Sequence, residues 1–353
     1  MSFMGSRRGR PTRRSRQRGA VAIMVAFFLL MIMGFAALAL DSFHLFVVRN
    51  ELQNDADAAV LAGAGALFTS HLINTPDFVT AEARAQAAIP LNPTMKAQLS
   101  QGEITGGYWN LTDGFQPLPM TPSANDYAAL KVKVLRSAGN NGGPVETFLA
   151  GMLGVSTVPL GAQATAVVMP PGGANPGALF PIAMTHCLFT NFWDFTANNP
   201  VSDPATGNPF IFKIGTPYQY DGCETGQWTS FLLDKNDTTT IRNLIANGNP
   251  DPISVGDQTW LEPGVKSALY TTVHNCSAAG DKTCEYVSMP VIETNDVTVH
   301  AQTKIAAFAC LHILDAVGGS EKYVLVQMTL GCHIDGSGGG IYYGTTLPPK
   351  LVQ

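Results

Sequence analysis

The side chains best suited to chemistry are six cysteines, all of which lie in the second half of the chain. Three of them stand beside a histidine or one residue away from it: His186-Cys187, His274-x-Cys276 and Cys332-His333. Imidazole and thiolate are typical zinc ligands, but zinc sites usually present them two to four residues apart, and no CxxC occurs. Adjacent side chains on a strand also point to opposite faces. We therefore expect no metal site, with zinc binding as the alternative.

An even number of cysteines in an exported domain is typical of a disulfide framework, and six cysteines allow fifteen pairings. The preferred pairing closes the shortest available loops: Cys187–Cys223, Cys276–Cys284 and Cys310–Cys332. The segment between Cys276 and Cys284 is hydrophilic and rich in turn residues, which favours that bridge most. Each bridge should stabilise the fold by about 2–4 kcal/mol. Free thiols are the alternative.

Two segments match part of a catalytic or phosphate-binding motif, but neither contains the whole motif. Ser337 lies between glycines, but Asp335 stands where a GxSxG motif needs its first glycine. Asp281 separates Gly280 from the following lysine, so that segment is not a phosphate-binding P-loop. We expect no enzymatic activity and no cofactor.

The acidic segment that begins at Asp234 starts like a calcium-binding loop. Its sixth and twelfth positions are Thr239 and Ile245, where such a loop needs glycine and glutamate. We expect a solvated turn in which Thr238 or Thr239 caps the following helix. Weak calcium binding is the alternative.

The N-terminal part of the chain, which carries none of these cysteines, contains a long apolar run. From Ala20 to Leu40 no charged or polar side chain occurs. As a helix this run would be about 31 Å long, which matches the hydrocarbon core of a bilayer. We predict a single membrane span, with Ala37-Leu38-Ala39 as an alternative signal-peptidase site.

The charge distribution gives the orientation of that span. Seven arginines precede Gly19, and no acidic residue occurs before Asp41. Without those seven arginines the chain has 14 basic and 26 acidic residues, and its formal charge falls from −5 to −12. The positive-inside rule then predicts a cytoplasmic N-terminus and a periplasmic remainder. So acidic a remainder is a poor binder of nucleic acid.

The helix should continue beyond the membrane as an amphipathic helix, to about Phe68. Apolar and small residues recur there at three- and four-residue spacing and form one face: Leu45, Val48, Leu52, Ala56, Ala59, Val60 and Gly63. Arg49, Asn54, Asp55 and Asp57 lie mainly elsewhere on the helix. The apolar face packs either on the protein's own domain or on partner subunits.

These residues resemble the N-terminal segment of TadG-like proteins of the Flp (Tad) pilus-assembly system. The resemblance covers about 50 residues, and Asp41 and a cluster after it carry it: Arg49, Asn50, Leu52, Gln53, Asn54, Ala56 and Asp57. It implies a bacterial inner-membrane anchor, a periplasmic body and a role in fimbrial assembly. The partners it implies are other Tad pilus-assembly proteins or pseudopilins.

Two departures from related families qualify this resemblance. TadE-like pseudopilins are cut after a glycine and carry glutamate at the fifth residue of the product, but Met24 stands there after Gly19. We therefore expect an uncut anchor rather than a pilus subunit. The DxSxS metal motif of some TadG relatives is absent.

The expected fold class is α+β, with five segments along the chain. They are a basic cytoplasmic arm (1–19), the transmembrane and amphipathic helix (20–68), a small α/β unit (69–169), a Pro/Gly linker (170–177) and a β-rich domain with the disulfides (178–353). We expect the last domain to be a sandwich or open barrel whose one clear helix is TTTIRNLIANG.

The function that these features favour is a non-catalytic assembly or structural factor that acts by protein–protein contact. An adhesin or glycan-binding surface protein is the alternative. It would use exposed aromatic residues such as Trp193, Trp228 and Trp260, although such residues more often serve packing.

Overall fold

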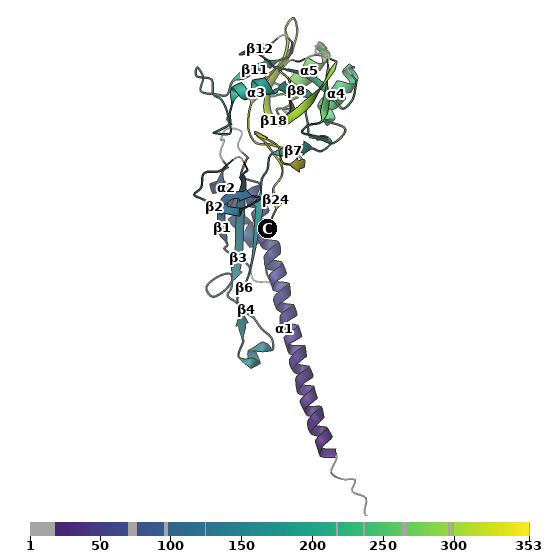
Figure 1. Cartoon of the computed structure of the whole chain (residues 1–353). Helices are drawn as coiled ribbons and strands as arrows, with labels where there is room; N and C mark the ends of the chain where they lie inside the picture. The colour runs from purple at the N-terminus through teal and green to yellow at the C-terminus, as the bar shows by residue number, and fades with distance from the viewer. Residues whose placement is uncertain are drawn as a thin grey trace, which may run out of the picture.

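The computed structural model describes residues 18–69, 76–94, 98–123, 125–216, 218–235, 237–262, 267–295, 297 and 300–352. The predicted basic arm lies almost entirely outside these ranges. Figure 1 shows a long helix that projects from a small α/β domain, with a β-rich domain at the opposite end. The predicted fold class is confirmed: a long N-terminal apolar helix precedes a mostly β C-terminal region with three disulfides.

Helix α1 (Arg18–Ala64) is continuous over 47 residues, a length of about 70 Å. It ends four residues before the predicted Phe68. There the backbone tightens into a turn, in which the Ala66 and Leu67 amides donate to the carbonyls three residues earlier. Both side chains are buried, so this turn packs into the core of the N-terminal domain.

The N-terminal domain is one antiparallel sheet covered by two helices. The sheet runs in the order β2-β1-β3-β6-β24. Its strands are β1 (Glu103–Asn110), β2 (Gly114–Pro117), β3 (Tyr127–Arg136), β6 (Leu160–Val167) and β24 (Lys350–Leu351). The second half of α1 packs on β3 and β6, and α2 (Phe78–Ala88) lies against α1 and β1. The turn η1 (Ile89–Leu91) follows α2.

Between β3 and β6 the chain leaves the sheet. This segment contains β4 (Val145–Glu146), the short 3-10 helix η2 (Ala150–Leu153) and β5 (Thr157–Val158). Gly154 ends η2 in the left-handed conformation, with φ of 93°.

The C-terminal domain is built on a sheet of order β11-β19-β18-β16-β14-β8-β17, in which β17 also pairs with β18. Its strands are β8 (Ile182–Thr185), β11 (Ile211–Ile214), β14 (Gly226–Phe231), β16 (Gln258–Glu262), β17 (Tyr286–Ile292), β18 (Ala301–Gly318), β19 (Lys322–Met328) and β22 (Tyr342–Tyr343). Strands β18, β16, β14, β8 and β17 therefore form a ring of pairings around the core of this domain.

Short strand pairs and helices surround this sheet. The pairs are β9 (Trp193–Asp194) with β10 (Asn199–Pro200), β12 (Gln219–Tyr220) with β13 (Cys223–Glu224), and β20 (Cys332–His333) with β23 (Thr345–Thr346). The helices are α3 (His186–Phe192), α4 (Thr238–Asn247) and α5 (Ser267–Cys276). Only α4 was expected.

Helix α5 escaped prediction because its run Thr271-Thr272-Val273 is β-branched, which favours strands. Burial of Leu269, Tyr270 and Val273 overrides that preference. The predicted cap of α4 is wrong: Asp237 is the N-cap, and its carboxylate accepts from the Thr240 amide at 2.8 Å.

The segment predicted as a linker, 170–177, contains a strand instead. Strand β7 (Pro171–Ala174) pairs with β15 (Ile253–Ser254) and β21 (Gly336–Gly338). Glycine is needed there for close packing, since a Cβ on Gly336 would lie 1.8 Å from the Gly173 carbonyl oxygen. The Gly-rich composition therefore marks tight strand packing and not a flexible linker.

The two domains are also not separate along the sequence. Strand β24, close to the C-terminus, returns to the N-terminal sheet and pairs with β6. The Leu347 amide donates to the Met169 carbonyl at 2.9 Å, and the rings of Phe68 and Tyr342 lie 5.6 Å apart. The predicted domain 178–353 thus contributes a strand to the first domain (Figure 1).

Candidate functional site

The first half of α1 is an apolar helix whose side chains are almost all exposed. Its most apolar 18-residue window has a mean hydropathy of 2.8 and is 0% buried. Phe27, Phe28 and Phe35 are each more than 60% exposed. Water does not tolerate so large a continuous apolar surface, whereas a bilayer stabilises it. Among the described residues this is the one helix long and apolar enough to cross a membrane, the pattern of a single-pass anchor.

The first acidic residue after the apolar run, Asp41, is buried although it lies on the projecting part of α1. Its carboxylate accepts hydrogen bonds from the backbone amides of Phe148 and Ala150, both at 2.6 Å, and from Leu149 at 3.1 Å. The three amides open the turn η2, so Asp41 fastens the β4–β5 segment to α1. No local signal in the sequence connects these residues, which are more than 100 positions apart.

The face predicted for helix interaction lies inside the N-terminal domain. Val48, Leu52, Ala56, Ala59 and Val60 are completely buried against the sheet and α2. Leu45 is partly buried at the edge of the same cluster. Fully burying each of the larger side chains stabilises a fold by about 1.5–3 kcal/mol. Of the two alternatives that the sequence left open, packing on the protein's own domain is the one observed.

Gly63 explains why small residues are needed on this face. A Cβ at Gly63 would lie 2.7 Å from the carbonyl oxygen of Ala81 on α2 and 2.4 Å from the Leu130 side chain on β3. Contacts under 3 Å force atoms to shift, so α2 and β3 approach α1 this closely only at a glycine.

The residues that carry the family resemblance divide between the two sides of α1. Leu52 and Ala56 are buried, and Gln53 donates from Nε2 to Asp57 at 2.8 Å and to the Gln163 carbonyl on β6 at 3.1 Å. A second group is exposed on the outer side of the helix: Arg49, Asn50 and Asn54. That outer side is open in the structure and can meet another molecule.

Asp55 was expected away from the apolar face, and this is wrong. The side chain is 0% exposed, and within the described residues neither carboxylate oxygen has a hydrogen-bond partner. Burial raises the pKa of Asp55 to about 6, and the opposing effect of the nearby Asn92 side chain is the smaller of the two. The spacing could have revealed it, because Asp55 lies three residues after Leu52 and four before Ala59.

The cysteines form the three pairs that the shortest-loop argument preferred, with Cα–Cα distances of 5.6, 5.0 and 5.4 Å. Their sulfurs are therefore not available as zinc ligands. The neighbouring histidines have polar partners of their own: His186 with Tyr343 at 3.1 Å, His274 with Asp315 at 2.6 Å and His333 with Thr346 at 2.8 Å. In the described part of the chain, no three His, Cys, Asp or Glu side chains gather to hold a metal ion.

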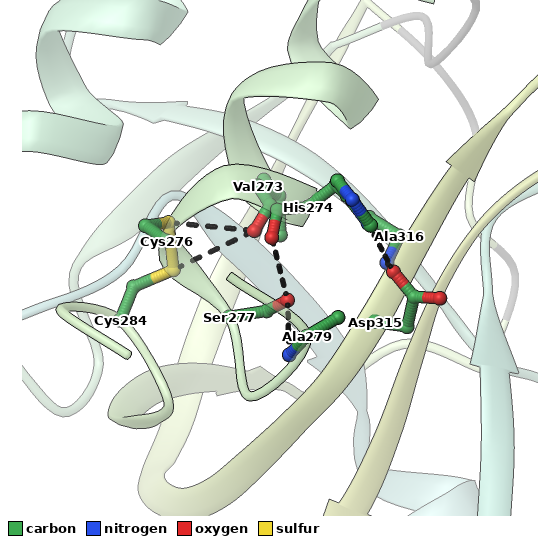
Figure 2. A network of polar contacts seen from close by, with 8 residues as sticks. All are labelled: Val273, His274, Cys276, Ser277, Ala279, Cys284, Asp315 and Ala316. Carbon is green, nitrogen blue, oxygen red and sulfur yellow. Dashed lines mark hydrogen bonds and ion pairs between the residues drawn. A yellow bond between two sulfur atoms is a disulfide. The ribbon is translucent and has the colours of Figure 1, made fainter. Parts of the chain in front are cut away.

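The His274–Asp315 pair has one feature of a catalytic dyad, and Figure 2 shows its surroundings. The nearby Ser277 hydroxyl donates to the backbone carbonyl of His274 at 2.9 Å, so its proton is engaged away from the imidazole. The Ala278 amide donates to Ile313 on β18 at 3.0 Å. Together with the Cys276–Cys284 bridge, this cluster fastens the end of α5 to β18.

Two further features lack the chemistry of a ligand site. A hollow of about 480 Å³ in the C-terminal domain is lined by His333 and Tyr286 but by no carboxylate, so it lacks the paired groups of acid–base chemistry. Trp193 and Trp228 are 3% exposed, and Trp260 is half-buried. These tryptophans do not form an exposed aromatic surface for a glycan.

Comparison with known protein families finds two matches. Residues 19–66 match the family described as "Putative Flp pilus-assembly TadE/G-like", and residues 62–166 match the one described as "Putative Tad-like Flp pilus-assembly". Comparison with curated proteins and with solved structures gives no match. The two matches contain nearly all of α1, and α2 and the strands up to β6, but not the C-terminal domain. Over residues 19–166 the chain thus matches the Tad families of Flp pilus-assembly proteins, which confirms the resemblance predicted from its N-terminal residues and supports a role associated with the Flp pilus.

Proposed function

We propose that this protein is an inner-membrane-anchored assembly or structural factor of the Flp pilus apparatus. It acts by protein–protein contact in the periplasm and catalyses no reaction. The observation that carries the proposal is the continuity of α1, in which an exposed apolar span leads without interruption into the segment that matches the Tad family.

Two features support a periplasmic body. Seven arginines precede the apolar span, and basic residues flanking a span stay on the cytoplasmic side. Three disulfides lie in the C-terminal domain, and disulfides persist in oxidising compartments such as the bacterial periplasm.

The contact surface that fits this role is the outer side of α1, defined here by Arg49, Asn50, Asn54 and Ala58. These residues are exposed, whereas the opposite face is filled by the protein's own sheet. Polar groups beside a small residue allow a second helix to approach closely and form hydrogen bonds. We propose that a pilin or another assembly protein packs here.

The first experiment places a photo-crosslinking amino acid at Asn54 in cells that assemble Flp pili, with Leu111 as a matched exposed control. Leu111 is 85% exposed and lies at the β1–β2 turn, away from α1. We expect crosslinks to a pilus-assembly protein from Asn54 and none from Leu111. Equal crosslinking from both positions would contradict the contact surface.

A second experiment tests the anchor and the role. Mass spectrometry of the mature N-terminus should find the apolar span retained, in a protein that alkaline extraction does not release from membranes. Deletion of the gene should abolish surface pili, and a His274→Ala/Asp315→Asn variant should restore them. A mature chain that begins near Leu40, or normal piliation after deletion, would refute the proposal.

A further inference from the structure

The segment between β3 and β6 carries a cluster of exposed apolar side chains. Phe148 is 67% exposed, Met152 78% and Val155 50%. Across residues 145–158 the one charged side chain is Glu146, and there is no lysine or arginine. Three large apolar side chains gathered at the tip of one loop mark a contact with an apolar phase or partner.

The position of this loop is fixed relative to the apolar span of α1. Asp41, the residue directly after the span, accepts the hydrogen bonds from the start of η2. One helical turn further on, the rings of His44 and Phe148 lie 4.6 Å apart. The loop is therefore held at the level of α1 where the apolar run ends.

That level coincides with a bilayer interface. His44 lies about 6 Å along the helix from Leu40, at 1.5 Å per residue. The polar layer on each side of the hydrocarbon core is about 5–8 Å thick, the difference between ~30 Å and ~40–45 Å shared by two leaflets. Figure 1 shows β4 and the turn after it as the part of the body that reaches farthest along α1 toward its N-terminal end.

We propose that residues 145–158 form a second membrane contact, in which Phe148, Met152 and Val155 enter the interfacial layer of the bilayer that α1 spans. The proposal rests on α1 being a membrane anchor. Lipid is the occupant argued for, because the apolar tip is continuous with the end of the span. Since the loop has no basic residue, the contact needs no anionic headgroup.

Two contacts with the bilayer fix an orientation that one helix cannot. A single span leaves the body free to tilt and to rotate about its axis. With the loop seated beside α1, strands β3 and β6 point away from the membrane, over about 33 Å for the ten residues of β3. The C-terminal domain, beyond the far end of this sheet, is then held at a set height above the bilayer (Figure 1).

The test uses the full chain in phosphatidylcholine nanodiscs, with a spin label on one introduced cysteine at a time. All six native cysteines are in disulfides, so each introduced thiol is labelled alone. The three variants are Met152→Cys in the loop, Leu111→Cys at the opposite end of the sheet, and Phe35→Cys in the span. The measurement is the collision rate with oxygen, which enters lipid, relative to that with a water-soluble nickel complex.

We expect the oxygen-to-nickel ratio at position 152 to exceed that at position 111 several-fold and to lie below that at position 35. A ratio at position 152 equal to that at position 111, with position 35 in lipid, would overturn this inference alone. A label at position 35 that behaves as if in water would overturn the membrane anchor itself. Adding phosphatidylglycerol should leave the ratio at position 152 unchanged.

Discussion

Asp55 offers the sharpest test of the N-terminal domain, since it is an acidic side chain buried in the apolar face of α1. Its pKa is raised by burial from an ordinary 3.8 to about 6. One unit of pKa shift corresponds to about 1.4 kcal/mol, so ionised Asp55 costs the fold about 3 kcal/mol at neutral pH. That is a large part of the stability of an ordinary domain.

The direction in which stability changes with pH follows from which state, folded or unfolded, binds the proton of Asp55 more tightly. Below the unfolded pKa of 3.8 the carboxyl is protonated in both states, and the penalty is absent. As the pH rises, the unfolded state ionises first while the folded state keeps its proton, so stability falls. Above the folded pKa of about 6 the penalty is complete and constant.

The perturbation is Asp55→Asn, which keeps the shape of the side chain and removes its charge. Hydrogen exchange over residues 48–64, compared between variant and wild type at equal pH, measures their difference in stability. Between about pH 4 and pH 8 that difference should grow in favour of the variant by about 2.5 kcal/mol, or roughly 60-fold in protection. The amide's own burial cost does not depend on pH and so cancels from this growth.

Asp57→Asn is the matched control, two residues away and hydrogen-bonded to Gln53 on the partly exposed side of α1. It should produce no comparable growth in protection with pH. If Asp55→Asn and wild type exchanged in constant ratio from acid to alkaline pH, Asp55 would not be a buried acid with a raised pKa, and the reasoning would fail.

Three further predictions follow from single contacts. Gly63→Ala should destabilise the N-terminal domain by about 1–3 kcal/mol in thermal unfolding, because its Cβ would overlap α2 and β3. Gly65→Ala should not, since a Cβ there would lie 3.4 Å from its nearest neighbour. Equal stability of both variants would contradict this packing. Replacing Cys187 and Cys223 by serine should cost about 4 kcal/mol, given their separation of 36 residues, and should increase hydrogen exchange in the C-terminal domain but not along α1. Asp41→Asn should increase hydrogen exchange by roughly tenfold or more at the three amides that Asp41 binds, since hydrogen bonds to a charged group contribute about 1.5–3 kcal/mol. Unchanged exchange at these amides would show that the loop is held by other contacts.

Several features followed from the sequence alone because their physical cause is local. An apolar run with no polar interruption can only be stable as a helix in lipid or in a core, so the span of α1 was predictable. The three- and four-residue spacing from Val48 to Gly63 predicted a helix face, and the choice of the shortest available loops predicted the disulfide pairs.

Composition misled where the same residues serve two purposes. Glycine and proline at 170–177 are typical of a linker, yet glycine also permits strands to pack closely, as Gly173 does against Gly336. The β-branched run in α5 disfavours a helix by local preference, and no helix was predicted there, but burial of one side against β18 stabilises one. In both places long-range packing outweighed local preference.

The residue pattern along the chain predicted the parts of this protein: an apolar span, an amphipathic continuation with Tad-type residues, and six cysteines in an acidic body. How these parts meet is a property of the folded chain. It filled the expected interaction face with the protein's own sheet, buried Asp55, brought β24 back to β6, and used Asp41 to hold a loop from more than 100 residues away at the end of the span. Such contacts join residues that are distant along the chain, and no local pattern of residue types encodes which distant backbone a carboxylate or a strand edge will find.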